Sequence, residues 1–176
     1  MKRGTIVCLA AFMLAGASAA NAQYVFVGGG ASIPIGDFKD AGGKTGWAVQ
    51  TGVGYDIGSK GLFVEAEGFY GSHGYSDSDA KTKPLTVLGA VGYSFMPGKK
   101  VSPYVIAGAG IMSVKNSVGG ESHTESEFAY SGAAGLGFNL NPTVHMWIEG
   151  RLLGTKDAKM IPVMLGFTFN FGKKSM

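Results

Sequence analysis

The stretch Gly46-Trp-Ala-Val-Gln-Thr-Gly-Val-Gly-Tyr-Asp-Ile57 decides the fold, because larger and smaller side chains alternate along it without a break. One face would carry Trp47, Val49, Thr51, Val53, Tyr55 and Ile57. The other face would carry Ala48, Gln50, Gly52, Gly54 and Asp56. Successive side chains of a β-strand point to opposite faces, so the pattern predicts a strand with one large, mostly apolar face. The segment 161–171 repeats it, with isoleucine, valine, leucine and three phenylalanines on one face.

Working outward from this stretch, the alternation recurs along the chain and predicts eight strands. They are expected at residues 23–32, 46–57, 61–70, 85–95, 102–114, 127–139, 143–153 and 160–171. Short connections that carry turn residues follow the second, fourth and sixth strands. The other connections, 34–45, 71–84, 115–126 and 154–159, are longer and polar. Short turns at one end and long loops at the other are typical of outer-membrane barrels, in which the long loops are extracellular.

The apolar faces have two explanations. In a soluble sandwich or a lipocalin-like binder they would form a core, whereas in a membrane barrel they would face lipid. A lipocalin needs a large apolar interior, and the opposite faces here carry mainly glycine, alanine, serine and acids. Strands of about 9–11 residues suit a tilted membrane strand, and closure removes the open edges that lipid cannot satisfy. We therefore expect a transmembrane barrel.

The first 22 residues have the composition of a cleavable signal peptide. Lys2 and Arg3 precede an uncharged apolar run over 5–17, and Ala20-Asn21-Ala22 is a small-x-small cleavage site. We expect a signal peptide at 1–22, export by the general secretory route after cleavage near Ala22, and a barrel domain at 23–176. An N-terminal membrane anchor is the alternative, but the apolar run is shorter than the ~20 residues of a spanning helix.

Cysteine and charge exclude several classes of function. Cys8, the one cysteine, lies in the predicted signal peptide, so the mature domain would have no disulfide or thiolate site. Without Lys2 and Arg3, 13 basic residues remain against 12 acidic ones. A net charge of +1 does not favour nucleic acid as a partner.

Aromatic residues gather near the expected strand ends. We predict an aromatic girdle at the membrane interfaces formed by Tyr24, Trp47, Tyr55, Tyr70, Tyr93, Tyr104, Phe128 and Tyr130. Tyrosine and tryptophan prefer this interface because their rings are apolar and their tips polar. A soluble core would not sort such residues to strand ends.

With these features, the chain resembles the small eight-stranded outer-membrane barrels of the OmpA/OmpX-like type. The similar segments are Gly28–Phe38 with Gly46-Trp47, Ser102–Gly110, Trp147–Arg151 and Val163–Phe171. The resemblance implies an all-β fold, an eight-stranded antiparallel up-and-down transmembrane β-barrel in the outer membrane of a diderm (Gram-negative) bacterium. It also implies an assembly signal in the last strand, Gly166, Phe169 and Phe171, which the barrel-assembly machinery would read. Here Gly172–Met176 follow the final aromatic, which is a departure from the family's usual ending.

The inward faces suggest a polar lumen. We expect a network of Gln50, Asp56, Glu65, Glu67, Glu149 and Arg151. Buried charges need partners, so these residues favour an interior salt-bridge network that plugs the barrel. A gate or narrow conduit for small or apolar molecules is the transport alternative, and a catalytic acid pair is the third.

No cofactor, metal or catalytic residue is predicted. An outer-membrane lipid-modifying enzyme would need a serine or histidine with a base partner, and His73 and His123 merely stand beside serines in expected loops. Asp77 and Asp79 lack the spacing of a calcium loop. Lys81, Lys83, Lys156 and Lys159 could meet anionic headgroups. The predicted role is structural or surface-interacting, with outer-membrane lipid, lipopolysaccharide and a loop-bound extracellular ligand as partners.

Overall fold

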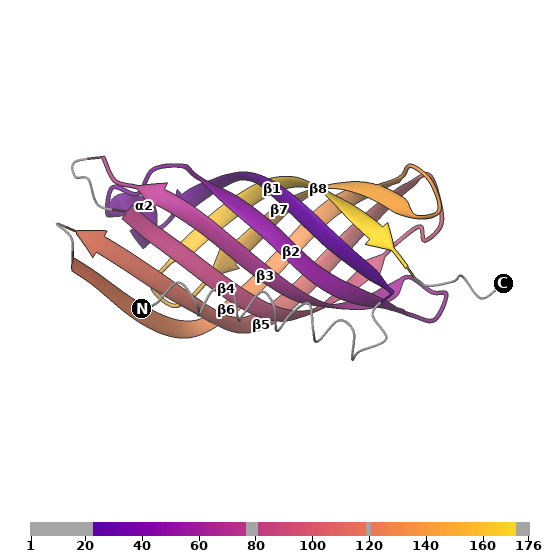
Figure 1. The fold of residues 1–176 in the computed structure, drawn as a ribbon, viewed down its shortest axis with the longest axis horizontal. Helices are drawn as coiled ribbons and strands as arrows, with labels where there is room; N and C mark the ends of the chain where they lie inside the picture. The colour runs from indigo at the N-terminus through magenta and orange to yellow at the C-terminus, as the bar shows by residue number, and fades with distance from the viewer. Residues whose placement is uncertain (1–22, 77–80, 119–120, 172–176) are drawn as a thin grey trace.

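The computed structural model is an eight-stranded barrel in which every strand is antiparallel to its neighbours (Figure 1). The strands follow one another around the wall in sequence order, and β8 pairs with β1 to close it. The predicted all-β, up-and-down fold is therefore confirmed. The structure describes residues 23–76, 81–118 and 121–171. The expected signal peptide, 1–22, lies outside them.

The elements in chain order are β1 (Tyr24–Ile35), α2 (Asp37–Asp40), β2 (Gly46–Ile57), β3 (Leu62–Gly74), β4 (Lys81–Ser94), β5 (Val101–Val118), β6 (Glu121–Asn139), β7 (Val144–Gly154) and β8 (Lys159–Asn170). Among the described residues, no helix has the length and apolar character needed to cross a membrane.

Closure of the wall depends on the pairing of the first and last strands. Twelve residue pairs join β1 to β8, from Tyr24 opposite Asn170 to Ile35 opposite Lys159. The backbone N–H of Phe171 also donates to the carbonyl of Gln23 at 2.8 Å, which joins the last described residue to the first. An open edge in lipid would leave backbone groups without hydrogen bonds, so this ladder lets the strands sit in a membrane.

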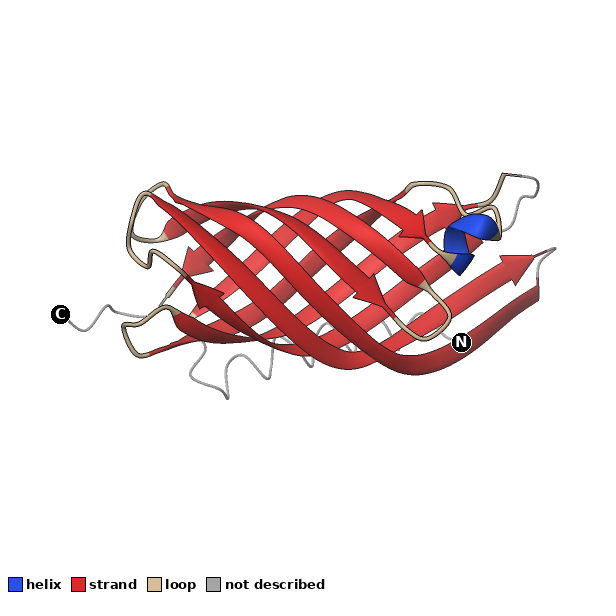
Figure 2. Ribbon diagram, turned by 180° about the vertical axis from the view of Figure 1, so that it is seen from behind, coloured by secondary structure: helices blue, strands red, loops and turns tan. Residues whose placement is uncertain are grey.

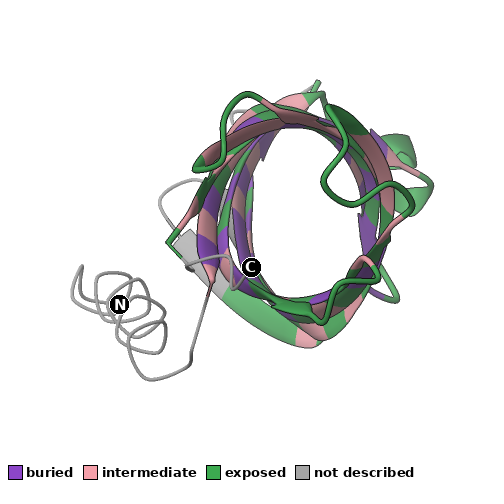
Figure 3. Ribbon diagram, turned by 90° about the vertical axis from the view of Figure 1, so that its right-hand side faces the viewer, coloured by how far each residue is buried: buried purple, intermediate pink, exposed green. Residues whose placement is uncertain are grey.

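The alternation of the strands separates an outer apolar surface from an inner core. Figure 3 looks along the barrel and shows buried and exposed residues alternating around its wall. Valines, leucines and phenylalanines of alternate positions are exposed on the outside, for example Val49, Val91 and Leu165. The buried side chains lie inside, including Phe26, Phe69, Leu88 and Met164. The large faces are thus directed outward, as expected for a barrel in lipid.

Two expected loops are largely strand, which corrects the sequence analysis. Most of 115–126 belongs to β5 and β6, which pair without a break from Val101 opposite Phe138 to Val118 opposite Glu121. Likewise β3 continues to Gly74 and β4 begins at Lys81. The polar composition of these segments marks where the strands leave the membrane, because a strand in water can have two polar faces. The sheet itself continues beyond the membrane, and the β5–β6 hairpin stands out at the right of Figure 2.

The third expected loop, 34–45, contains the short helix α2. Gly36, which precedes it, has a φ of 57°, a left-handed conformation that favours glycine. The helix buries Phe38, whose ring lies 5.1 Å from His73 and 6.2 Å from Tyr75, centroid to centroid. The helix therefore packs on the end of β3, at the same end of the barrel as the long hairpin (Figure 1).

Candidate functional site

The charged centre of the lumen is organised around Arg151 of β7. Its Nη1 and Nη2 donate to the two carboxylate oxygens of Glu67 at 2.8 and 2.9 Å, and its Nε donates to Glu149 at 2.9 Å. Nη1 also donates to the hydroxyl of Ser131 at 3.0 Å. The guanidinium stacks on Phe69, with Cζ 4.8 Å from the ring centroid. Arg151 is 1% exposed and Glu67 is fully buried, so the guanidinium forms a bidentate ion pair with Glu67 inside the barrel.

Two tyrosines extend this cluster toward the end of the barrel where Gln23 and Phe171 are hydrogen bonded. Tyr104 donates its hydroxyl to Glu149 at 3.1 Å, and Tyr24 donates to Glu65 at 3.0 Å. The prediction that Tyr24 and Tyr104 belong to the aromatic girdle is wrong, because both point into the lumen. Tyr24 shares the inner face of β1 with Phe26, and that parity was the available signal. For β5, both faces are small or apolar, so the sequence carried no such signal.

Two members of the expected polar network lie apart from Arg151. Asp56 is exposed near the end of β2, where its backbone N–H donates to the side chain of Gln23 at 3.2 Å. Gln50 is 3% exposed, and its Oε1 has no hydrogen-bond partner among the described residues. Ser32 and Thr86 also have buried hydroxyls that no described residue contacts by a hydrogen bond, and both line a cavity of about 10 Å³, the space of one water.

The rest of the interior is filled by aromatic rings that lie on glycines of the neighbouring strand. The pairs are Tyr24 with Gly54, Phe26 with Gly52, Phe63 with Gly92, Tyr104 with Gly135 and Trp147 with Gly166. A Cβ atom built at any of these glycines would collide with the ring. The expectation of an interior of small residues and acids was therefore incomplete. Small residues alternate with large ones because each ring needs an empty position beside it.

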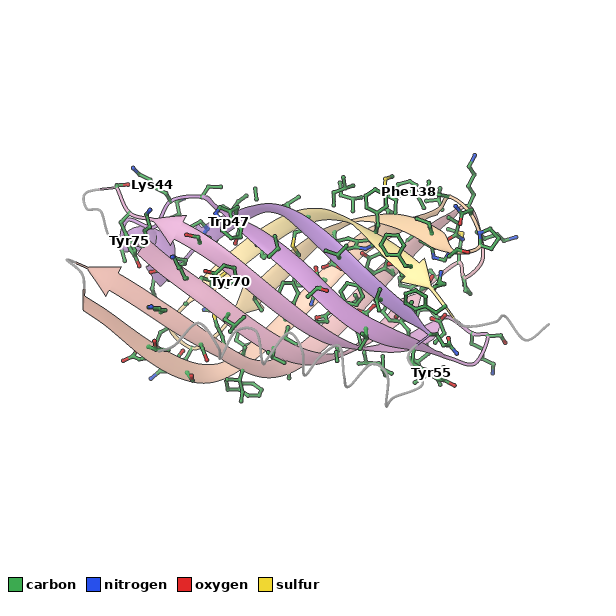
Figure 4. All side chains as sticks on the ribbon, in the orientation of Figure 1. Lys44, Trp47, Tyr55, Tyr70, Tyr75 and Phe138 are labelled. Atoms are coloured by element: carbon green, nitrogen blue, oxygen red, sulfur yellow. The ribbon has the colours of Figure 1, made fainter. Side chains whose placement is uncertain are left out.

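The other predicted girdle residues face outward at two levels of the barrel. Trp47 and Tyr70 meet edge to face, with centroids 5.7 Å apart, on the α2 side of Figure 4, while Tyr55 lies at the far end. Tyr93 also lies at that far end, in contact with Phe95, their centroids 5.3 Å apart. Phe128 and Tyr130 are exposed on β6, Phe128 to 69%. These six side chains point toward the surroundings of the barrel.

The predicted assembly signal occupies the last strand. Phe169 is exposed on the outer face of β8, and Phe171 is exposed directly after the strand. Gly166 faces the lumen and lies under the indole of Trp147. Packing of the indole therefore explains why residue 166 is glycine, whether or not another protein recognises the strand.

The structure separates the residues considered for catalysis. Ser72 and His73 are successive residues of β3, so their side chains point to opposite faces of the wall. His73 is buried, and its Nδ1 lies 3.1 Å from the carbonyl of Lys44, which requires that nitrogen to carry the proton. A further histidine, His145 of β7, lies 3.3 Å from the side-chain amide of Asn170 at the opposite end of the barrel and so is far from His73. Asp77 and Asp79 lie outside the described residues, and the side chain of His123 is not described.

The long hairpin has one strand edge that the barrel does not use. β7 pairs with β6 only from Tyr130, which lies opposite Gly154, to Asn139. From Glu121 to Ala129, β6 pairs with β5 on one side, and no described strand lies on the other. This edge is at the end of the barrel that carries α2 (Figure 1). Such a row of backbone donors and acceptors can bind an additional strand.

The geometry defines an outer-membrane barrel, and comparisons with known proteins agree. Residues 5–171 match the outer membrane protein beta-barrel domain family, and the chain belongs to this family. No curated protein matches the chain. The chain is similar to Neisserial surface protein A, NspA, with a TM-score of 0.70 and 16% identity over 84% of this chain and 96% of that one.

Two further solved structures share the fold. Ail, the attachment invasion locus protein of Yersinia pestis, has a TM-score of 0.54 and 21% identity, over 85% of this chain and 99% of Ail. The outer-membrane enzyme PagL has a TM-score of 0.51 and 18% identity, over 84% of this chain and 99% of PagL. Ail has also been solved in a phospholipid bilayer nanodisc and with the heparin analogue sucrose octasulfate. The protein is thus an integral outer-membrane β-barrel of a fold that includes an enzyme.

Proposed function

We propose that this barrel is a non-catalytic surface-interaction protein with a closed lumen, and that the end bearing α2 and the β5–β6 hairpin faces the exterior. The single observation that carries the proposal is the strand edge of β6 from Glu121 to Ala129. An extended chain that adds to this edge would gain main-chain hydrogen bonds without any change in the barrel. The edge therefore provides a binding mode that does not need a folded loop domain.

The lumen supports a structural rather than a transport role. Arg151, Glu67 and Glu149 cross the middle of the barrel with direct contacts of 2.8–2.9 Å. The interior also holds the ring contacts of Tyr24, Phe26 and Trp147 and the side chains of Leu88, Met112 and Met164, each of the last three at most 1% exposed. A conduit would need these groups to separate. The packing favours a plug over the narrow channel that was the alternative.

The charge of the hairpin indicates the chemistry of the added chain. Side chains of Glu125 and Glu127 lie on the face of β6 that carries the buried Ala129, which is the face toward the barrel axis. Like charges placed opposite each other destabilise a strand pair, so a second copy of this edge would be a poor partner. An extended segment with basic side chains at alternate positions fits better. We propose such a peptide as the extracellular ligand.

Proline substitution tests this edge with an internal control. Successive N–H groups of an antiparallel strand point to opposite sides, so of Ser126→Pro and Glu127→Pro one removes a hydrogen bond to β5 and the other removes a donor from the edge. The variant with the lower thermal-unfolding midpoint is the one that has lost the hydrogen bond to β5. We expect the other variant to stay stable and to lose binding of a fluorescent peptide of alternating lysine and threonine, measured by anisotropy.

Equal binding by the wild type and by the stable proline variant would contradict the role of the edge. The same peptide with glutamate in place of lysine is the control for charge, and we expect it to bind more weakly. Protease digestion of the hairpin on intact cells tests the orientation separately, because only an exterior hairpin is cut.

Three partners follow from the outer-membrane location. Lipid surrounds the apolar wall, and we propose that lipopolysaccharide contacts its exterior half. We also propose that the barrel-assembly machinery reads Phe169 and Phe171, whose outward exposure supports recognition. Phe171→Ala should then lower the yield of assembled barrel in cells while Phe128→Ala, an exposed control on β6, does not.

The signal peptide at 1–22, with cleavage near Ala22, stays a prediction that N-terminal sequencing of the mature protein checks.

We propose that the barrel has no catalytic activity, although the outer-membrane enzyme PagL has a similar fold. The proposal is supported by the opposite directions of Ser72 and His73 and by the enclosure of Glu67 and Glu149 around an arginine. Incubation with phospholipid and with lipid A in detergent provides the test. Release of fatty acid from either lipid would contradict the proposal that the barrel is non-catalytic.

A further inference from the structure

Three lysines converge on the outer face of the sheet where it leaves the membrane. Lys83 of β4 and Lys115 of β5 lie directly opposite each other in the ladder, and Lys81 lies two residues from Lys83 on the same face. All three are exposed. The sequence grouped Lys81 and Lys83 with Lys156 and Lys159, but the last two lie near the start of β8, which adjoins β1 and β7. Only the register brings Lys115 beside Lys83.

The rows of the ladder give the depth of these lysines. The outermost fully apolar row consists of Val87, Ile111 and Phe128. The next row on the same face consists of Leu85, Ser113 and Ser126, and the hydroxyls of the two serines are 2.8 Å apart. The row after that consists of Lys83, Lys115 and Thr124. The surface thus changes from apolar to hydroxyl to cationic in two steps.

This order matches the layers of a membrane. Two rows correspond to about 13 Å along a strand, or roughly 10 Å of height at a tilt near 40°. The headgroup region is about 5–8 Å thick on each side of the hydrocarbon. A lysine can bend its side chain toward that region. The ammonium groups of Lys83 and Lys115 can therefore reach the phosphates at the base of the headgroups.

The pairing of two like charges needs an explanation. Like charges directly opposite each other on a sheet are destabilising. Within the part of the chain that the structure describes, neither Lys83 nor Lys115 forms an ion pair. The acids Glu125 and Glu127 belong to the opposite face of the hairpin, toward the barrel axis. A bound anion between the two ammonium groups would turn the repulsion into attraction.

We propose that Lys81, Lys83 and Lys115 form a site for the phosphate groups of the glycolipid in the outer leaflet. This site rests on the proposed orientation, in which the hairpin is exterior. Through the ammonium groups of these lysines, lipopolysaccharide would contact the barrel. The site is independent of the strand edge, which lies along β6. The protease test on intact cells separates a wrong orientation from a wrong site.

Binding of fluorescent lipopolysaccharide to the purified barrel in a zwitterionic detergent tests the site. We expect the double variant Lys83→Ala/Lys115→Ala to weaken binding about fivefold for each lysine, or about 25-fold in total. The matched control, Lys156→Ala/Lys159→Ala, removes the same charge elsewhere and should bind like the wild type. Lipopolysaccharide stripped of its phosphates should bind the double variant and the wild type equally, and competition by inorganic phosphate alone should be weak.

A second measurement gives a change of sign that a purely structural role would not produce. In the zwitterionic detergent, Lys83→Ala should raise the unfolding midpoint because the repulsion from Lys115 is removed. In membranes that contain lipopolysaccharide, the same variant should lower the midpoint because an anion contact is lost. Equal loss of affinity in the control variant, or the same sign of the stability change in both media, would overturn the proposal.

Discussion

At the scale of the residue, Arg151 neutralises two of the acids inside the barrel, Glu67 and Glu149. It is 1% exposed and is hydrogen bonded to Glu67, Glu149 and Ser131. Removal of one partner from a buried ion pair leaves an uncompensated charge, whereas replacement of the whole group by apolar residues is often neutral. Arg151 therefore stabilises the barrel only because the carboxylates of Glu67 and Glu149 are buried beside it.

Substitution of this arginine has a predictable effect. We expect Arg151→Met to lower the free energy of unfolding by about 3–5 kcal/mol, because the buried carboxylates of Glu67 and Glu149 lose their cation. Urea titration of the barrel in lipid vesicles, followed by tryptophan fluorescence, measures the change. The triple variant Arg151→Met/Glu67→Gln/Glu149→Gln should recover much of the loss. A triple variant no more stable than Arg151→Met would show that the charges are not the cause.

At the scale of the element, neighbouring strands are matched by size across the ladder. Phe63 of β3 lies over Gly92 of β4, and Tyr104 of β5 lies over Gly135 of β6. These glycines are required by the volume of a ring on the next strand. Other glycines, such as Gly89 on the outer face of β4, have no neighbouring atom within 4 Å of an added Cβ. Substitution by alanine should therefore destabilise the barrel at glycines that lie under a ring, but not at glycines with open space beside them.

Two alanine substitutions in β4 separate them. Gly92→Ala should lower the free energy of unfolding by about 1–3 kcal/mol, because the new methyl group collides with the ring of Phe63. Gly89→Ala, three residues away in the same strand, should leave stability unchanged or raise it by about 0.5–1 kcal/mol. Thermal unfolding in detergent compares both with the wild type. Similar losses in the two variants would mean that strand propensity, rather than the ring, sets the effect.

The strands also show why polar segments are poor guides to loops. The segment 115–126 is hydrophilic, yet most of it pairs in the β5–β6 ladder. Alternation of large apolar and small residues is a signal of a sheet in lipid, and it disappears once the strands enter water. The end of the alternation marks the membrane boundary. Where the strands end is decided by the pairing, which composition does not report.

At the scale of the whole molecule, closure and filling of the barrel act together. The β1–β8 ladder closes the sheet along its first and last strands, while among the described strands β6 keeps an unpaired edge from Glu121 to Ala129 at the end that carries α2. An eight-stranded barrel has an interior just wide enough for side chains to fill. The rings, the methionines and the charge cluster occupy it here. This filling supports the proposal of a surface-interaction protein with a closed lumen.

Conductance checks the filling of the lumen directly. We expect the wild-type barrel to show no steady single-channel steps in a planar lipid bilayer, because Arg151 and the aromatic rings span the lumen. A wide porin in the same membrane is the positive control. Successful insertion is verified by the different gel mobility of unboiled and boiled protein recovered from the bilayer lipids. Steady steps from inserted protein would support the channel alternative.

The alternation from Gly46 to Ile57 and from Ile161 to Phe171 predicted strands with one large apolar face, and the connection lengths and the aromatic residues near strand ends then favoured an up-and-down membrane barrel over a soluble sandwich. The inward acids and Arg151 could also be assigned to the lumen by parity alone. Only the tertiary structure decided that Tyr24 and Tyr104 bind carboxylates, that rings lie on glycines, and that Lys115 faces Lys83. Each of these depends on the register between strands. Register is set by pairing across the whole barrel, and the sequence of one strand does not contain it.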